Sequence, residues 1–446
     1  MRVAIVGAGI SGLAAAHTVA AAGIAVDVYD QADRVGGKLR TTPLAGLDLE
    51  EGADAFLLRV PEALALARSV GAPIVHPARS PALVYAAGRL RALPAGTVLG
   101  VPGTVRGLAS VLSPLGVARA ALDRLLPATA WHGDDVAIGA LVRRRLGRQV
   151  LDRMVDPLLG GVYAGSATGL STRMVAPALA DPGRSLLAAV ARRTPAAPTG
   201  DAPVFGSVRG GTGALATAVM SAVERAGGVL HTGTVVTGLE PAGAGWSLIT
   251  GRADRQRRSD YDAVVLAVPA GPAARLLQGQ LPEHLLPTTP YASVAIVTLV
   301  YPPGTPVPAG NGFLVAADAR HTVKAVTFVG NKWGHPADAP VVVRASVGRF
   351  GAEASLRRPD SELAGVAAAD IAAMAGVPGR PLQWRVSRWG GALPQYRPGH
   401  LTRTAALRAA MPAGLAVCGA AYDGVGIPAC VRSGELAGAG LRALAG

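Results

Sequence analysis

Three glycines and an acid near the start of the chain have the spacing of a dinucleotide site. Gly7, Gly9 and Gly12 form the pattern G-x-G-x-x-G directly after a short apolar run. In this pattern the backbone N–H groups at the start of the following helix can hold a pyrophosphate. Asp30 comes roughly 20 residues later, where a carboxylate can bind a ribose diol. The same carboxylate would repel a 2′-phosphate, so the spacing argues against NADP.

Three elements must hold these residues in place. The sequence predicts a buried strand at Val3–Val6, an alanine-rich helix that ends by Gly23, and a second strand at Ala25–Tyr29. Together they form a βαβ unit that brings Asp30 to the glycine turn. Arg2 and the apolar run also resemble a secretory signal peptide, but three glycines within the run and a strand after it argue against that interpretation.

Later segments repeat the same theme. Ala263–Pro269 is a continuous apolar strand typical of a parallel sheet, and it follows a hairpin predicted around Val236 and Trp246. Near the C-terminus the sequence predicts a buried strand, a flexible turn and a closing helix, at Gly414–Cys418, Gly419–Pro428 and Ala429–Ala445. This second turn and helix could also direct backbone N–H groups at a cofactor.

Two insertions separate these segments. Residues 59–203 are mostly helical in pattern, with an apolar stripe on one face formed by Val150, Leu151, Met154, Val155, Leu158 and Leu159. Pro157 lies within this stripe, so we expect the helix to kink or end there. The Pro- and Gly-rich segment Thr194–Gly211 is typical of a connection. Within residues 291–388, alternating runs at Val294–Val300 and Val341–Val347 predict a second sheet.

Composition limits the possible functions. A chain of 446 residues exceeds what one hydrophobic core usually supports, so we expect two or three domains. The net charge of +14 suits an anionic substrate, an anionic membrane surface or simply a solvated basic surface. Aromatic residues make up only 4% and do not alternate with basic clusters, so no nucleic-acid partner is expected.

The cysteines and histidines point away from two further classes of protein. Cys418 and Cys430 cannot form a disulfide framework, so we expect a reducing compartment and a cytoplasmic protein. The histidines and cysteines do not have the spacing of metal ligands, and no metal site is expected. The sequence also contains no G-x-S-x-G motif, and hydrolytic chemistry has no candidate residues.

Several motifs resemble a known superfamily. The chain has D-x-x-x-R-x-G-G from Asp30 to Gly37 and EGAD from Glu51 to Asp54, and both resemble the FAD-binding segments of the amine-oxidase-like superfamily. Three longer segments resemble its oxygen-dependent coproporphyrinogen III and protoporphyrinogen oxidases, particularly the former. They are RRRLGRQVLDRMVDPLLGGVYAG at 143–165, RWGGALPQYRPGH at 388–400 and GVGIPACVRSGE at 424–435. The resemblance covers nearly the whole chain.

This resemblance implies a fold and a set of cofactor contacts. The fold would be α/β, with a discontinuous Rossmann-type FAD-binding domain (1–58, 204–290 and 389–446), a mainly helical insertion (59–203) and a mixed-sheet substrate domain (291–388). The implied FAD contacts are Gly7, Ala8, Gly9, Ile10, Ser11, Gly12, Asp30, Gln31, Arg34, Gly36, Gly37, Lys38, Gly52, Ala53, Asp54, Ala55, Val236, Trp389, Val425, Gly426 and Ile427. Trp389 could instead be a core aromatic residue, and Asp54 the N-cap of a following helix.

The resemblance also implies an activity. It is the FAD-dependent oxidation of coproporphyrinogen III to coproporphyrin III in haem biosynthesis, with O2 as acceptor and release of H2O2. Coproporphyrinogen has four propionates and protoporphyrinogen two, so the basic chain favours coproporphyrinogen. Candidate partners for these carboxylates are Arg59, Arg89, Arg91, Lys332 and Arg397. No residue stands out as the proton acceptor, so the catalytic residue stays open.

Other functions remain as alternatives. Protoporphyrinogen IX oxidation is the nearest, followed by a flavin amine oxidase, which would need an aromatic cage, and a carotenoid desaturase, which would need an apolar tunnel. A flavin-free escort protein for GTPases is the non-enzymatic alternative, although Asp30 and the Gly424–Pro428 loop favour a retained flavin. A weak peripheral contact with a membrane and the oligomeric state are left open.

Overall fold

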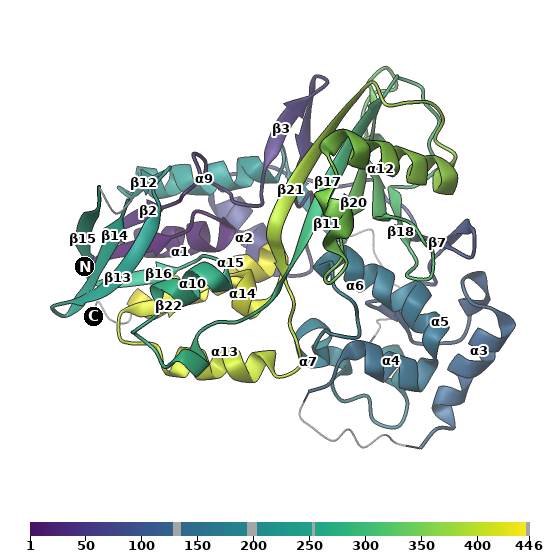
Figure 1. Cartoon of the computed structure of the whole chain (residues 1–446), viewed down its shortest axis with the longest axis horizontal. Coiled ribbons are helices and arrows are strands. Elements are labelled where there is room, and N and C mark those ends of the chain that lie inside the picture. Colours follow the sequence, from purple (N-terminus) through teal and green to yellow (C-terminus); the bar gives the residue numbers. More distant parts are fainter. Residues whose placement is uncertain (128–134, 194–202, 252–254, 443–446) are drawn as a thin grey trace. The chain divides into compact units, whose positions relative to one another are not determined.

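A computed structural model describes residues 1–127, 135–193, 203–251 and 255–442 of the chain. The chain forms two compact units, and Figure 1 labels their helices and strands. Unit 1 comprises residues 1–76, 204–289 and 401–446, and unit 2 comprises residues 77–203 and 290–400. Which stretches bind the cofactor and which bind the substrate stays a prediction.

A five-stranded parallel sheet forms the centre of unit 1. Its order is β12-β2-β1-β16-β22, with bounds Val229–His231, Ala25–Tyr29, Arg2–Val6, Ala263–Leu266 and Leu415–Val417. The predicted strands at both ends of the chain and at Ala263 are therefore confirmed. Val3, Ala4 and Ile5 are all fully buried although they alternate between the two faces, so both faces of the sheet are covered.

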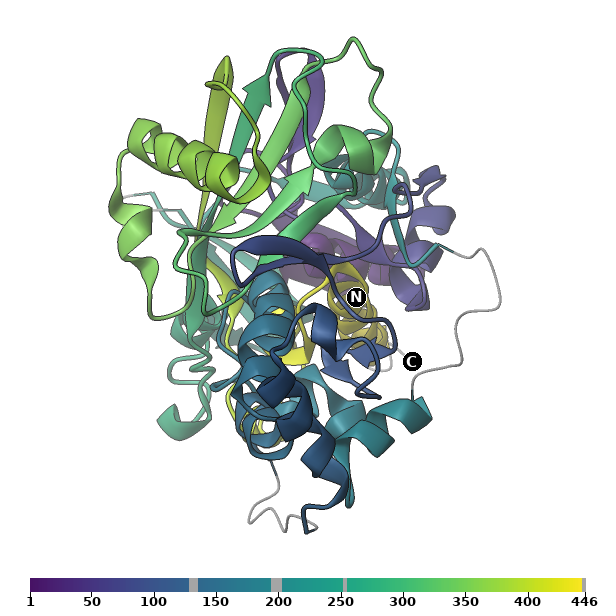
Figure 2. The ribbon, with the colours of Figure 1, turned by 90° about the vertical axis from the view of Figure 1, so that its right-hand side faces the viewer.

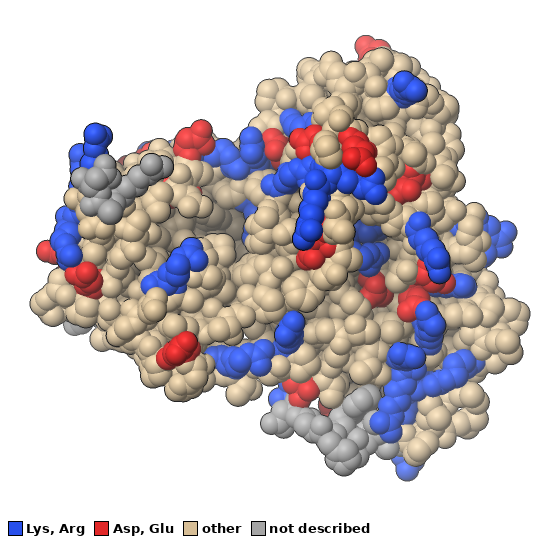
Figure 3. Space-filling view, viewed as in Figure 1, with Lys and Arg blue, Asp and Glu red and all other residues tan. Residues whose placement is uncertain are grey.

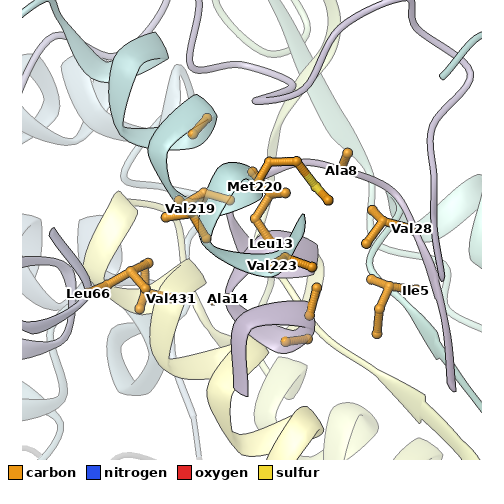
Figure 4. Packing of buried hydrophobic residues seen from close by; sticks show 14 of the residues in the cluster. Ile5, Ala8, Leu13, Ala14, Val28, Leu66, Val219, Met220, Val223 and Val431 are labelled. Carbon is orange, nitrogen blue, oxygen red and sulfur yellow. The ribbon is translucent and has the colours of Figure 1, made fainter. Parts of the chain in front are cut away.

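Four helices pack in one buried cluster against this sheet. They are α1 (Ile10–Ala20), α2 (Pro61–Ser69), α9 (Thr212–Arg225) and α15 (Ile427–Arg442). Figure 4 shows this cluster, with Leu13 of α1 between Val219 of α9 and the sheet residue Ile5 in the view. The predicted closing helix is confirmed as α15, which begins two residues earlier than expected. Its predicted end at Ala445 lies outside the described residues.

Smaller elements complete unit 1. The predicted hairpin is confirmed: β13 (Val236–Ala242) pairs antiparallel with β14 (Gly245–Thr250), and β15 (Arg257–Tyr261) extends it. Two further small sheets are β3 (Thr41–Leu44) with β4 (Leu47–Glu50), and β5 (Phe56–Leu57) with β11 (Phe205–Val208) and β6 (Ile74–Val75). The remaining helices of the unit include α10 (Ala270–Leu276), α13 (His400–Ala409) and α14 (Ala420–Asp423).

A seven-stranded mixed sheet forms the centre of unit 2, which confirms the predicted second sheet. Its order is β21-β17-β20-β19-β18-β7-β8, with bounds Gln383–Pro394, Tyr291–Tyr301, Val341–Val347, Val323–Phe328, Gly312–Val315, Leu83–Ala86 and Arg89–Ala92. Figure 2 shows α12 (Asp360–Ala375) along one face of these strands. On that face Val297, Val343 and Phe328 share a buried cluster with Leu363 of the helix.

Strands β7 and β8 interrupt the mainly helical stretch 59–203 and were not predicted. They form an antiparallel hairpin, and β7 pairs in parallel with β18 at the edge of the large sheet. The turn between them uses Ala87 and Gly88, both with positive φ, of 50° and 79°. Two central residues with positive φ are typical of a two-residue hairpin turn. Alanine at the first position hides that signal in the sequence.

The rest of unit 2 is largely helical. Its helices include α3 (Pro114–Ala121), α4 (Ile138–Leu146), α5 (Arg148–Val150), α6 (Asp156–Tyr163), α7 (Thr172–Val175) and α8 (Leu186–Arg193). Between α5 and α6 the turn η3 (Leu151–Val155) is π-helical. Pro157 at the start of α6 has no N–H to donate to the preceding turn, which is the π-helical one. The helix does not end at this proline, because α6 continues to Tyr163, and a kink there stays a prediction.

Two further observations concern the chain as a whole. Of the predicted connection Thr194–Gly211, residues 194–202 lie outside the described residues, and its later part contains strand β11. Among the helices that the structure describes, none is long and apolar enough to cross a membrane.

Candidate functional site

The glycine turn joins β1 to α1, and two of its three glycines have no room for a side chain. A Cβ at Gly7, where φ is +106°, would lie 2.7 Å from the Ala267 carbonyl oxygen. A Cβ at Gly12 would lie 1.9 Å from the Gly7 carbonyl oxygen. At Gly9, in contrast, a Cβ would meet no atom of the described residues within 4 Å. The fold therefore requires Gly7 and Gly12, whereas Gly9 leaves space open beside the turn.

The first turn of α1 carries backbone donors next to Gly9. Gly9 occupies the N-cap position, and no described side chain caps this helix end. The N–H groups of a first helical turn have no acceptor within the helix. Together with the partial positive charge of the helix end, they are suited to binding a phosphate group.

Asp30 lies at the end of β2 and contacts the glycine turn directly. Its Oδ2 accepts a hydrogen bond of 2.7 Å from the Ala8 N–H, and its Oδ1 accepts one of 2.8 Å from the Ala32 N–H. The Thr234 N–H donates a hydrogen bond of 2.8 Å to the Asp30 carbonyl oxygen. This bond holds the segment that leads to Val236 next to Asp30. Each carboxylate oxygen has a second lone pair that can accept from a ribose hydroxyl.

The predicted bend after Asp30 folds back onto the same turn. The Gly36 N–H donates a hydrogen bond of 2.8 Å to the Ala8 carbonyl oxygen. Arg34 fixes the bend by donating to the carbonyl oxygens of Val35 and Gly37 at 3.1 and 3.0 Å. The arginine at this position therefore supports the backbone of the bend.

The C-terminal turn meets the start of α1 within unit 1. A Cβ at Gly419 would lie 3.4 Å from Ser11 Oγ, and one at Gly434 only 2.0 Å from the Ser11 carbonyl oxygen. Burial lowers the pKa of Lys38, and the nearby Cys430 in the first turn of α15 opposes that shift. The glycine turn, the bend and the C-terminal turn thus surround one helix end.

Residues 52–55 are attached to this region through α9. The Thr212 hydroxyl donates a hydrogen bond of 2.9 Å to the Ala53 carbonyl oxygen. Asp54 precedes strand β5, and the N-cap of the next helix, α2, is Val60. The alternative role of Asp54 as a helix N-cap is therefore wrong.

Unit 1 contains every predicted cofactor residue except Trp389. That residue lies on β21 in unit 2, where it packs against a buried cluster that includes Ala164, Val294 and Ala392. The contact of Trp389 with a flavin stays a prediction. Its packing against this cluster favours the alternative role, that of a core aromatic residue.

In unit 2 the two motifs at 143–165 and 388–400 pack together. Gln395 Nε2 donates a hydrogen bond of 2.8 Å to the Tyr163 carbonyl oxygen. A Cβ at Gly165 would lie 2.1 Å from Gln395 Oε1, so a larger residue there would displace the Gln395 side chain. The rings of Tyr163 and Tyr396 meet edge to face with centroids 5.9 Å apart. Burial raises the pKa of Tyr163 to about 12, so its hydroxyl keeps its proton at neutral pH.

The five predicted carboxylate partners lie in four separate segments of the chain, and only Arg89, Arg91 and Lys332 lie on a strand or helix. Arg91 uses its guanidinium to donate to two backbone carbonyl oxygens, and Arg89 is its exposed neighbour on β8. Lys332 and Arg397 lie near aromatic rings, at 5.3 and 5.9 Å from the ring centroids. Arg59 is exposed just before α2. Their binding of a substrate stays a prediction.

Comparison with known families identifies the chain. Residues 10–440 match the family described as flavin containing amine oxidoreductase. The chain belongs to this family. As a flavin containing amine oxidoreductase it is an FAD-dependent enzyme, and the predicted α/β fold is confirmed. The uncapped start of α1 and the open space at Gly9 fit the pyrophosphate of FAD.

Individual relatives of this flavin containing amine oxidoreductase match it over nearly its whole length. It is 38% identical to a coproporphyrinogen III oxidase from Mycobacterium leprae, over 96% of this chain and 95% of that protein. It is 40% identical to a coproporphyrinogen III oxidase from Mycobacterium tuberculosis, over 96% and 94%. A crystal structure from Exiguobacterium sp. 255-15, provisionally assigned as a protoporphyrinogen oxidase, has a TM-score of 0.87 at 28% identity, with 99% of each chain covered.

Lys324 was not identified from the sequence, and the structure shows that this basic residue is buried. Lys324 on β19 is 3% exposed, and burial, together with the charge of Arg349, lowers its pKa to about 7. The signal was present in the sequence, because this lysine interrupts the apolar strand VKAVTF. A cation inside a buried strand is unusual unless it is paired or has a function.

No metal centre accompanies the flavin site in the part of the chain that the structure describes. His, Cys, Asp and Glu side chains there form no group of three or more that could hold an ion.

Proposed function

We propose that this flavoenzyme oxidises coproporphyrinogen III to coproporphyrin III, with dioxygen as acceptor and hydrogen peroxide as second product. The observation that carries the proposal is the 38% identity to an enzyme of that name over 96% of the chain. The close packing of the two porphyrinogen-oxidase-like motifs in unit 2 supports it, because neither motif is needed merely to hold a flavin.

Unit 1 would hold the cofactor by the contacts described above. The N–H groups at the start of α1 would bind the pyrophosphate, and Asp30 the adenosine ribose. Lys38 and the turn Val425–Ile427 would lie toward the flavin. Bound FAD would supply the acceptor for two electrons in each round, and three rounds convert the porphyrinogen to the porphyrin.

The charge of the protein suits an acidic tetrapyrrole. The net charge is +14, and Figure 3 shows groups of Lys and Arg side chains scattered over the visible face, with Asp and Glu among them. A positive field raises the local concentration of an anionic substrate and its association rate. Four propionates gain more from this field than two, which favours coproporphyrinogen over protoporphyrinogen.

Protoporphyrinogen IX oxidation is the second candidate. The observation in its favour is the fold match to the Exiguobacterium protein, which is provisionally assigned that activity. The chemistry is the same oxidation of a porphyrinogen ring, so only a direct comparison of the two substrates separates the candidates.

The experiment uses the full chain loaded with FAD. Coproporphyrinogen III and protoporphyrinogen IX, each prepared without oxygen, are mixed with the enzyme, and air is then admitted. Porphyrin fluorescence and peroxide are followed together, with an enzyme-free sample to measure spontaneous oxidation. We expect faster oxidation of coproporphyrinogen, with three peroxides per porphyrin. Oxidation of neither substrate above the enzyme-free rate would refute the proposal, and oxidation of protoporphyrinogen alone would establish the second candidate.

A further inference from the structure

Lys324 is a buried cation without a counter-charge. Its side chain is 3% exposed, and it makes no hydrogen bond or ion pair with any described residue. The charged residue that acts on it is Arg349, which is also a cation. A buried ammonium group with no anion beside it is unfavourable, because burial removes its hydration without replacing it. Among the described residues, the Lys324 ammonium group therefore has no anion that compensates for its burial.

The lysine lies on the face of the large sheet opposite α12. Phe328 of the same strand packs with α12, whereas Leu314 of the neighbouring strand faces α6, where a Cβ at Gly161 would lie 3.3 Å from its Cδ2. Arg349 is held on the α6 side by an ion pair of 3.2 Å with Asp156 of α6. The register shift between Val323 and Ala325 lets Lys324 turn to the side of Ala325 and Ser346, away from α12. The charge of Arg349 acts on Lys324, which agrees with a place on the α6 side.

A break in the regular strand pairing explains how a lysine comes to this position. The register between β19 and β20 shifts between Val323 and Ala325, and Lys324 is the extra residue. Such a bulge redirects a side chain and is common beside functional sites. Ala325 pairs with Ser346 on β20, and both are partly exposed. The sheet next to the lysine is therefore accessible from outside.

Further polar groups share this face of the sheet. Arg344 pairs in register with Thr298 on one side and Thr327 on the other, and alternates with the core residue Val343. Arg344 is 8% exposed, and the fully buried Thr298 hydroxyl has no hydrogen-bond partner among the described residues. A row of buried polar groups on one face, opposite an apolar face, is typical of a binding surface.

The local charge is positive. Arg349 shares its one nearby acid, Asp156, with the Ala167 N–H and the Ser166 hydroxyl, and Lys324 has no acid of its own. The elements that pack against β19 carry Arg344 on β20, Lys332 on the helix Val329–Trp333, Asp156 on α6, and Asp360, Glu362 and Asp370 on α12; Arg349 follows β20. Asp370 lies on α12, the other side of the sheet, where it accepts hydrogen bonds from the Thr322 and Val323 N–H groups.

We propose that Lys324, with Arg349 beside it, binds a carboxylate of the substrate on this face of the sheet. The proposal rests on the proposed function, which supplies a tetrapyrrole with four propionates. A propionate would give Lys324 its missing counter-charge, and the Arg349 guanidinium could donate to the same group. Lys324 is not among the five carboxylate partners predicted from the sequence.

The test measures binding to the FAD-loaded protein by titration with coproporphyrin III and with its tetramethyl ester in the same mild detergent. The variant is Lys324→Met, which keeps the volume and removes the charge. The control is Arg320→Met, which removes an exposed cation four residues earlier in the chain. We expect Lys324→Met to raise the Kd of the tetra-acid about 10- to 100-fold, the range of one charge-assisted hydrogen bond, and to leave the Kd of the ester unchanged. The control should change neither value.

Steady-state kinetics give an independent readout. With coproporphyrinogen III, the KM of Lys324→Met should rise by the same factor, while kcat stays within about threefold of the wild type, because the lost contact serves binding. Removing an unpaired buried charge should not lower Tm, so misfolding would not explain the effect. Lys324→Gln repeats the test if the methionine variant is unstable.

The outcomes separate this proposal from the proposed function. Equal changes for acid and ester, or no change for either, would overturn the carboxylate site. If the wild type oxidises coproporphyrinogen but Lys324→Met binds the tetra-acid normally, only the site is refuted. If the wild type oxidises no porphyrinogen while the acid-specific loss is present, the activity is refuted and the carboxylate site stands.

Discussion

Alanine at Gly9 should weaken FAD binding without harming the fold, whereas alanine at Gly12 should destabilise the fold itself. The two glycines belong to one motif and are three residues apart. Their surroundings differ, because a Cβ at Gly9 meets no described atom within 4 Å, and a Cβ at Gly12 would lie 1.9 Å from the Gly7 carbonyl oxygen. The comparison therefore separates a glycine kept for a ligand from one required by the chain.

The expected magnitudes follow from these distances. Gly9 has φ −70° and ψ 169°, which alanine adopts without strain. The Gly9→Ala apoprotein should therefore be as stable as the wild type or more stable by about 0.4–1 kcal/mol, through the entropy of the unfolded chain. Gly12→Ala overlaps backbone atoms, and overpacking of this kind costs about 1–3 kcal/mol or more.

The loss of FAD affinity is set by the bonds that a new methyl group displaces. A hydrogen bond between a backbone amide and a charged phosphate contributes roughly 1.5–3 kcal/mol. Each bond lost at Gly9→Ala should therefore weaken FAD binding about 10- to 150-fold.

The assay uses apoprotein freed of FAD. Stability is measured from urea unfolding followed by circular dichroism, and FAD affinity from the quenching of flavin fluorescence on titration. If Gly9→Ala binds FAD within a factor of two of the wild type, the pyrophosphate does not lie at this turn. If its apoprotein is destabilised as much as Gly12→Ala, Gly9 serves the fold and the distinction drawn here is wrong.

Three more perturbations test other parts of the molecule. Asp30→Asn replaces one of the two oxygens that accept from the Ala8 and Ala32 N–H groups by an NH2 group, so it should lower the unfolding free energy by about 1–2 kcal/mol. It should also weaken FAD binding about tenfold, with exposed Asp48→Asn as a neutral control. Asp123→Ala leaves the buried guanidinium of Arg145 without its carboxylate and should cost about 3–5 kcal/mol in urea unfolding; a cost below about 1 kcal/mol would contradict this. The pKa of Lys324 falls from 10.5 to about 7 on folding, so the unfolded chain binds the extra proton between these values. This residue should make stability rise with pH across that window, and Lys324→Met should remove the rise. Binding of coproporphyrin III to the wild type should weaken as pH rises above about 7, because a carboxylate requires the charged ammonium.

The parallel sheet of unit 1 could be predicted because its strands are buried on both faces. Such strands appear in the sequence as short apolar runs, and the segments at Val3–Val6, Ala25–Tyr29 and Ala263–Leu266 are all strands of this sheet, with Asp27 the one charged residue among them. The glycine turn and Asp30 were also predictable, because their spacing is fixed by the length of a single βαβ unit.

The hairpin β7–β8 could not be predicted from the same kind of evidence. Its turn contains Ala87 with φ +50° in place of the asparagine or aspartate that signals such turns. Its place in the sheet depends on the pairing of Leu83 with Phe313, which are far apart in the sequence. Local patterns carry no information on a pairing of this kind.

Lys324 shows a different limit of the sequence. The carboxylate partners predicted from the sequence are four arginines and one lysine, and the reason for them is the bidentate pairing of a guanidinium with a carboxylate. The structure points instead to a lysine inside an apolar strand, at a bulge whose existence depends on the register with β20. Neither the bulge nor the missing counter-charge could be known before the neighbouring strands and helices were in place.

The order of strands explains why the two ends of the chain share one site. In the order β2-β1-β16-β22 all strands are parallel, so the segments that follow β1, β16 and β22 leave the sheet at the same edge. The close approach of Gly7 to Ala267 and of Gly419 to Ser11 are two consequences of that arrangement. The Gly434 contact with Ser11 then seats α15 against α1 so tightly that only glycine is tolerated. Gly434 of the last helix therefore supports the predicted cofactor site from behind, by fixing the start of α1, and it need not touch the cofactor.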